Sequence, residues 1–150
     1  MRDSDKVGRT AETERWPAAL PAVRVRVARP TDRLDEVVRF YRDGLGLPEL
    51  FRFSGHDGYD GVMLGLPGAS YHLEFTSHVD GSPCPAPTAD NLLVLYFDGE
   101  RDRDAVAARL TALGHPVVPS ENPFWDKHGA VTVEDPDGWR VVLATTRAFG

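Results

Sequence analysis

Apolar and charged residues alternate one for one along residues 23–28, which read VRVRVA. An alternation with a period of two is typical of a β-strand whose two faces lie in different surroundings. The same alternation places Arg24 and Arg26 together on one face of this strand. The opposite face carries three valines, which we expect to pack under the following helix: Val23, Val25 and Val27.

The rest of the first half predicts one helix and three more strands. Apolar residues recur at helical spacing from Leu34 to Leu45, and Gly44 or Gly46 ends this helix. Three runs rich in β-branched and aromatic residues follow, separated by glycine-rich turns. The expected strands are residues 49–53, 61–66 and 71–76.

The second half repeats this order after a segment rich in proline, serine and glycine, residues 77–90, which has the composition of a linker. A helix with Val106 and Leu110 on one face is expected to end at Gly114. Residues 120–129 are expected to form a loop. Strands are predicted at residues 91–97, 116–119, 130–134 and 139–145. The chain therefore predicts an α+β fold of two tandem βαβββ modules.

Composition narrows the classes of partner. With 41% hydrophobic and 27% charged residues, the 150-residue chain is typical of a globular protein. A net charge of -6 disfavours nucleic acid as a partner, and no apolar run is long enough to cross a membrane. The single cysteine, Cys84, excludes an internal disulfide. We expect a cytoplasmic protein with neither a nucleic-acid nor a membrane partner.

Two motifs carry a resemblance to a known superfamily. RFYRDGLGL (39–47) is similar to the first-helix motif of vicinal oxygen chelate proteins, and EDPDGWRVVL (134–143) is similar to their last hairpin. This superfamily includes glyoxalase I, extradiol dioxygenases, fosfomycin-inactivating transferases and bleomycin-binding resistance proteins. The resemblance implies a cup-shaped sheet of the glyoxalase/bleomycin resistance/dioxygenase-like fold, and a homodimer.

The resemblance covers about residues 22–146 and fixes the expected boundaries along the chain. An N-terminal arm, which we expect to be disordered, precedes one domain made of both modules. The segments are the arm (1–20), the first module (22–76), the linker (77–90) and the second module (91–146).

Metal-dependent members of the superfamily place one ligand, usually His or Glu, on the first and last strands of each module. Carried over to this sequence, those positions fall on Arg26, Glu74, Asn91 and Val142. Only Glu74 matches the ligand chemistry, because an arginine has no lone pair to offer and a valine has no donor atom. We therefore expect no cofactor. The alternative is a divalent metal held by Glu74 and His72, which lie two apart on one strand.

The hypothesis is that the cup binds a small anionic or oxygen-rich molecule without a metal, since arginine grips carboxylate or phosphate in two bonds. Arg26 can instead pair with Glu74 as a structural replacement for the metal. The alternative function is a divergent metal-dependent lyase, transferase or dioxygenase that uses Glu74 and His72, the candidate catalytic residues. The candidate ligand-binding residues are Arg24, Arg26, His72, Glu74, Asn91, Trp125 and Arg140.

Trp125 enters this set because aromatic side chains in a loop near the cup mouth can stack on a ligand. It can also anchor its own loop by packing in the core. Both readings of this residue are open from the sequence.

Overall fold

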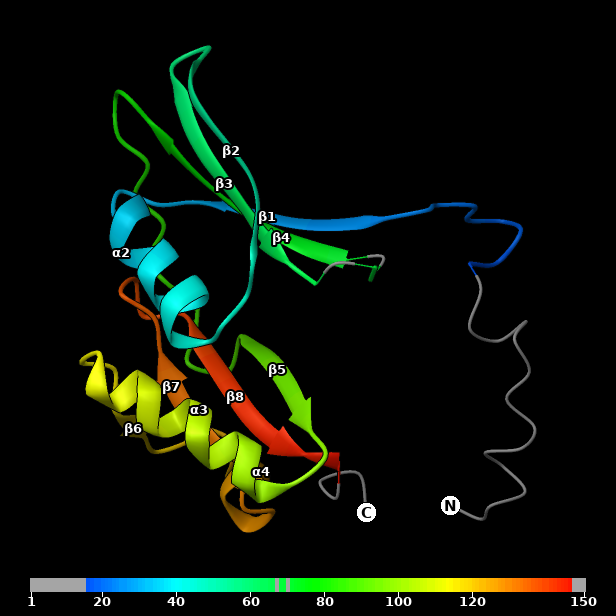
Figure 1. Cartoon of the computed structure of the whole chain (residues 1–150), viewed down its shortest axis with the longest axis vertical. Helices are drawn as coiled ribbons and strands as arrows, with labels where there is room; N and C mark the ends of the chain where they lie inside the picture. Colours follow the sequence, from blue (N-terminus) through cyan, green and yellow to red (C-terminus); the bar gives the residue numbers. More distant parts are fainter. Residues whose placement is uncertain (1–15, 67, 70, 147–150) are drawn as a thin grey trace.

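The computed structural model describes residues 16–66, 68–69 and 71–146, and these form two four-stranded sheets (Figure 1). The strand orders are β1-β4-β3-β2 and β5-β8-β7-β6, so each module repeats the same topology. In each sheet the first strand pairs in parallel with the last strand of its module, and the other pairs are antiparallel. The two tandem modules expected from the sequence are confirmed.

The first module contains β1 (Val25–Pro30), α2 (Leu34–Val38), η1 (Arg39–Gly44), β2 (Glu49–His56), β3 (Tyr59–Gly65) and β4 (Tyr71–His78). The helix continues from α2 into η1, a π-helical turn that ends where the sequence predicts. It covers one face of the sheet. Its buried side chains, Val37, Phe40 and Tyr41, join Leu64 and Phe75 in the core.

The second module contains β5 (Leu92–Phe97), α3 (Glu100–Ala112), β6 (Val117–Val118), α4 (Pro123–Lys127), β7 (Val131–Glu134) and β8 (Arg140–Thr145). The expected loop at residues 120–129 is wrong in part, because it contains the short helix α4. The Asn122 side chain accepts a hydrogen bond from the Phe124 N–H at 3.0 Å, and Pro123 occupies the first turn. This capping pattern was readable in the sequence.

The valines of the opening alternation do not pack under the helix as expected. Val23 is 86% exposed and precedes β1, while Val27 is 53% exposed. Figure 1 shows the reason, because the first half of β1 runs beyond the end of the helix. The alternation predicted the strand and its two faces correctly, but a periodic pattern does not say how far the helix layer extends.

Two segments flank the first module: the N-terminal arm before it and the linker after it. Residues 1–15 of the expected disordered arm lie outside the described residues, and Leu20 closes a turn onto Pro17. Strand β4 takes the first two residues of the expected linker. The rest of the linker is tied to both modules: the Ser82 N–H donates to Asp32, and the Trp139 indole donates to the Cys84 carbonyl at 3.0 Å.

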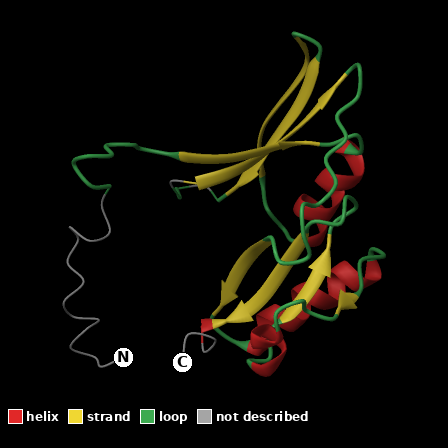
Figure 2. Cartoon of the chain, turned by 180° about the vertical axis from the view of Figure 1, so that it is seen from behind, coloured by secondary structure: helices red, strands yellow, loops and turns green. Residues whose placement is uncertain are grey.

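The helical segments of both modules lie along the same side of the molecule (Figures 1 and 2), where η1 and α3 meet. The Arg109 guanidinium of α3 donates to the carbonyls of Gly44 at 2.7 Å and Leu45 at 3.2 Å. These are C-terminal carbonyls of the first helix, which have no partner within the helix itself. Within the described part of the chain, no helix is long and apolar enough to span a membrane.

A buried polar network also joins the modules. Arg29 pairs with Asp135 and, at 2.9 Å, with Asp137, both in the turn before β8. The Tyr41 hydroxyl donates to Asp135 at 2.8 Å. The Arg29 guanidinium also lies between the rings of Phe75 and Trp139, at 5.0 and 4.9 Å.

Candidate functional site

The face of the N-terminal sheet opposite α2 and η1, called the open face from here on, gathers the polar residues that the alternation singled out. Arg26 lies beside His72 across the parallel β1–β4 pair. Met63 lies opposite Glu74 across the antiparallel β3–β4 pair. Their neighbours along β4, Leu73 and Phe75, point to the helix side and are buried. The strand period therefore places Arg26, His72 and Glu74 on one surface.

Arg26 is the centre of this group. Its Nε donates to His72 Nε2 at 2.9 Å, its Nη1 lies 3.5 Å from Glu74 Oε2, and its Nη2 donates to Met63 Sδ at 3.5 Å. Because His72 Nε2 accepts a hydrogen bond, the neutral imidazole carries its proton on Nδ1. The Arg26 side chain is 46% exposed, whereas that of Glu74 is 12% exposed.

This geometry leaves Arg26 able to bind a ligand. A guanidinium carries five N–H donors, and the contacts of Arg26 with other described residues are those to His72, Glu74 and Met63. The sulfur of Met63 is a weak acceptor, so a carboxylate or phosphonate oxygen can replace it. Arg26 therefore contacts Glu74 and His72, while the exposed edge of its guanidinium remains available to a ligand.

The residues at the superfamily's metal positions do not fit a divalent metal. Glu74 is the single carboxylate among them, and Arg26 lies 3.5 Å from it. The lone pair that His72 Nε2 would give to a metal is engaged by the Arg26 N–H. Across the described residues, no three His, Cys, Asp or Glu side chains gather in a metal-sized group. A divalent metal normally needs three protein ligands, and a guanidinium repels it.

The second sheet presents a mainly apolar surface on its face opposite α3. Val142 and Ala144 cluster there with Ala130, Leu92 and Trp125. Trp125 therefore packs on the sheet, which agrees with the anchoring interpretation. The strand register places Leu92, beside Arg140, at the position that corresponds to Arg26 beside His72.

Among the described residues, none of the remaining candidates pairs with the Arg26 side chain. Asn91 was expected at a ligand position, but the strand register places Leu92 there instead, and Asn91 precedes β5. Asn91 Oδ1 accepts a hydrogen bond from the Thr88 hydroxyl at 2.6 Å. Arg140 donates to Glu134 and to the Pro119 carbonyl, each at 3.0 Å. Arg24 is exposed and precedes β1. Asn91 and Arg140 both border a cavity between the modules.

Sequence reasoning missed Arg29, the arginine of β1 that is the most deeply engaged. It lies on the helix side, in register with Phe75. The Arg29 side chain is 11% exposed, and Asp135 and Asp137 hold it from the other module. The DPDG turn contains both acids, but no local pattern connects that turn to a residue more than a hundred positions earlier.

Two family models match the two modules of this chain. The YycE-like N-terminal domain matches residues 25–76, and the YycE-like C-terminal domain matches residues 90–145. The chain is 48% identical over 132 residues to the uncharacterized protein YycE of Bacillus subtilis (strain 168), covering 88% of this chain and 94% of that protein.

Solved structures agree with this match. The crystal structure of a Bacillus subtilis YycE protein of unknown function, for which a glyoxalase or fosfomycin resistance role is suggested, superposes with a TM-score of 0.81 at 48% identity, over 87% of this chain and 93% of that one. TnmS3, an antibiotic binding protein from Streptomyces sp. CB03234, gives 0.56 at 25% identity over 80% and 92% of the chains. Trypanothione-dependent glyoxalase I of Leishmania major gives 0.61 at 17% identity over 85% and 88%, which shows the fold alone.

Proposed function

Because this chain belongs to the YycE family, within the vicinal oxygen chelate superfamily, we propose that it binds a small anionic or oxygen-rich molecule on its open face without a resident metal. The comparisons support a glyoxalase- or fosfomycin-resistance-like protein as the general class. The observation that carries the proposal is the half-exposed Arg26 guanidinium, at a position that the resemblance assigns to a metal ligand.

Aromatic side chains beside this group support a ligand with an apolar part. Phe51 lies opposite Met63, and Phe53 lies opposite Gly61, on the open face. The Phe53 ring occupies the space where a Cβ at Gly61 would be, 2.2 Å from the ring's Cζ. Phe51 is 56% exposed. A molecule whose anionic group meets Arg26 can therefore lay an apolar part on these rings.

The test uses two anions, fosfomycin and glutathione, titrated into the full-length protein by isothermal calorimetry. For an anion that binds, Arg26→Ala is expected to weaken affinity at least about tenfold, since a hydrogen bond to a charged group contributes roughly 1.5–3 kcal/mol. Arg39→Ala is the matched control, because Arg39 is exposed on the first helix. The proposal fails if neither anion binds, or if Arg26→Ala binds as tightly as the wild type.

The alternative, a divergent metal-dependent enzyme, is favoured by the placement of His72 and Glu74 on one face with the catalytic fold of glyoxalase I. It is tested by incubating the protein with Mn, Fe, Ni or Zn, desalting, and measuring retained metal. We expect none to be retained near stoichiometry, because Arg26 competes for both donors. Near-stoichiometric metal that is lost in Glu74→Ala and kept in Glu36→Ala would make the enzyme the better reading.

We also propose that the protein functions as a homodimer in which a second copy covers exposed apolar surface. Leu20 is 55% exposed, Leu66 is 47% exposed, and Val23, which precedes β1, is 86% exposed. Sedimentation equilibrium is expected to give twice the chain mass of 16.5 kDa. A single-chain mass at micromolar concentration would contradict this part of the proposal.

A further inference from the structure

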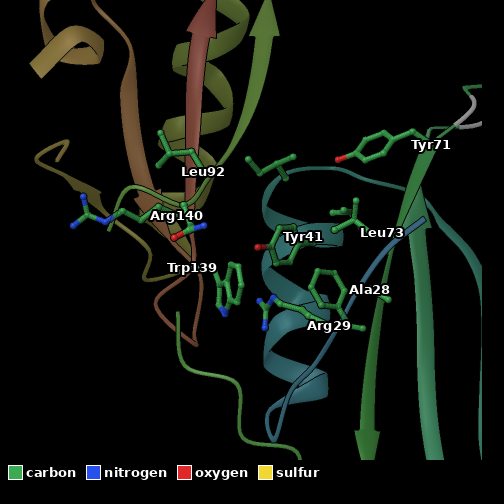
Figure 3. A pocket seen from close by; sticks show the side chains of 12 residues that line it. Ala28, Arg29, Tyr41, Tyr71, Leu73, Leu92, Trp139 and Arg140 are labelled. Atoms are coloured by element: carbon green, nitrogen blue, oxygen red, sulfur yellow. The ribbon is translucent and has the colours of Figure 1, made fainter. Parts of the chain in front are cut away.

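We propose that the cavity between the two modules is a second binding site, for an uncharged and largely aromatic molecule that carries a hydrogen-bonding oxygen. The cavity has a volume of about 310 Å³ and takes its walls from both modules (Figure 3). Small-molecule pockets range over about 300–1,000 Å³, so this one suits a molecule of one or two rings. The inference is independent of the proposed function of the open face.

The cavity is separate from the Arg26 group. Its wall on the N-terminal sheet includes the helix-side residues Val27, Leu73 and Phe75, which alternate along their strands with the residues of the open face, and Ala28 borders it between Val27 and Arg29. Opposite them stands Leu92 at the start of β5, with Trp139 near Arg29 (Figure 3). Leu93 also lines the cavity. An occupant of this cavity therefore lies on the other side of the sheet from His72 and Glu74.

The charges at the border of the cavity are already neutralised. Arg29 is held by Asp135 and Asp137, and Arg140 by Glu134 and a backbone carbonyl. An anion would have to compete with these carboxylates for a guanidinium, and a cation would find acids that are already paired. The electrostatics of the lining therefore favour an uncharged occupant.

Tyr71 supplies the polar contact. Figure 3 shows its hydroxyl directed into the space between the modules, and within the described part of the chain this hydroxyl has no hydrogen-bond partner. Burial raises the pKa of the Tyr71 phenol, so the group stays protonated at neutral pH and can donate. A ligand oxygen that accepts this proton would fix the orientation of an otherwise apolar molecule.

The experiment titrates 2-naphthol into the full-length protein by calorimetry and maps its position from backbone amide shifts. Tyr71→Phe is expected to weaken binding about three- to tenfold through the lost hydrogen bond. Val27→Trp, which fills the cavity from a half-exposed position, is expected to weaken it more than tenfold. Val79→Trp is the matched control, since Val79 is 80% exposed in another part of the fold, and its affinity should equal that of the wild type.

Three outcomes would overturn the inference. The first is that 2-naphthol does not bind, or that its shifts map away from the cavity residues. The second is that naphthalene-2-sulfonate binds this cavity more tightly than 2-naphthol, which would refute the uncharged ligand class. The third is that Val27→Trp dissociates an oligomer seen by sedimentation, which would make the cavity an interface between copies of the chain.

Discussion

At the scale of single residues, Tyr41 shows how burial and pairing combine. Its ring stacks on Phe75 with centroids 4.7 Å apart, and its hydroxyl donates to Asp135 of the second module. Burial, followed by the nearby Asp135 charge, raises the pKa of Tyr41 well above its ordinary value. One side chain thus belongs both to the core of the first module and to the contact between modules.

Tyr41→Phe is expected to lower the free energy of unfolding by about 1–2 kcal/mol at neutral pH, because Asp135 loses a buried donor. The folded phenol keeps its proton where the unfolded one loses it, so the wild type loses stability as pH rises above 10.0. Phenylalanine does not ionise, so the stability difference between the wild type and Tyr41→Phe should narrow at alkaline pH. Urea unfolding at pH 7 and above 10 measures both values.

The control for this prediction is Tyr59→Phe, at a tyrosine that is 42% exposed in the first hairpin. Its stability difference from the wild type should stay near zero at both pH values. A Tyr41→Phe difference that is the same at neutral and alkaline pH would refute the assigned ionisation.

At the scale of elements, the close approach of η1 to α3 depends on Gly44. A Cβ at Gly44 would lie 2.5 Å from Leu110 Cδ2, and Leu110 is fully buried. Real atoms do not approach so closely, so any larger residue must displace the leucine. The glycine that ends the first helix therefore also sets the distance between the two helical segments.

Gly44→Ala is expected to cost about 1–3 kcal/mol of stability by overpacking, measured by chemical denaturation. In a Leu110→Ala background the same change should cost less, since the colliding methyl group is gone. Gly99→Ala is the control: a Cβ there meets nothing within 4 Å, and the cost should be about 0.5 kcal/mol. Equal costs of Gly44→Ala in both backgrounds would contradict the contact.

At the scale of the whole molecule, a buried ion cluster joins the two modules, in addition to the contact between their helical segments and the bonds of the linker to both. Arg29 reaches from β1 to two acids of the last turn, between two aromatic rings. Asp135 also accepts from the backbone N–H groups of Asp137 and Trp139, at 2.8 and 2.9 Å. This cluster fixes how one module sits on the other.

Arg29→Ala is expected to destabilise the protein by about 3–5 kcal/mol, because it leaves two carboxylates without their cation in a buried site. Arg39→Ala, at an exposed arginine of the first helix, should cost no more than about 1 kcal/mol. Thermal unfolding of both variants measures the difference. Similar melting temperatures for the two would show that the cluster does not join the modules.

The sequence by itself determined most of the elements, the duplication and, in the first module, which residues share a face. Periods of 2 and 3.6 residues are local properties, and they correctly placed Arg26, His72 and Glu74 on one surface. Helix α4 was readable from its Asn-Pro start, although the composition of its segment suggested a loop. The register of β5 was predicted less well, because an all-apolar strand does not distinguish its two faces. The ligand position expected at Asn91 falls on Leu92.

The tertiary structure alone decided which arginine is buried and where the core ends. Arg24, Arg26 and Arg29 are similar in the sequence, yet Arg24 is exposed, Arg26 is half-exposed and Arg29 is enclosed between the modules. Asp135, which pairs with Arg29, lies 106 positions later in the sequence. Periodicity reports only on neighbours along the chain, whereas burial and pairing depend on how separate elements pack, and no local pattern records that.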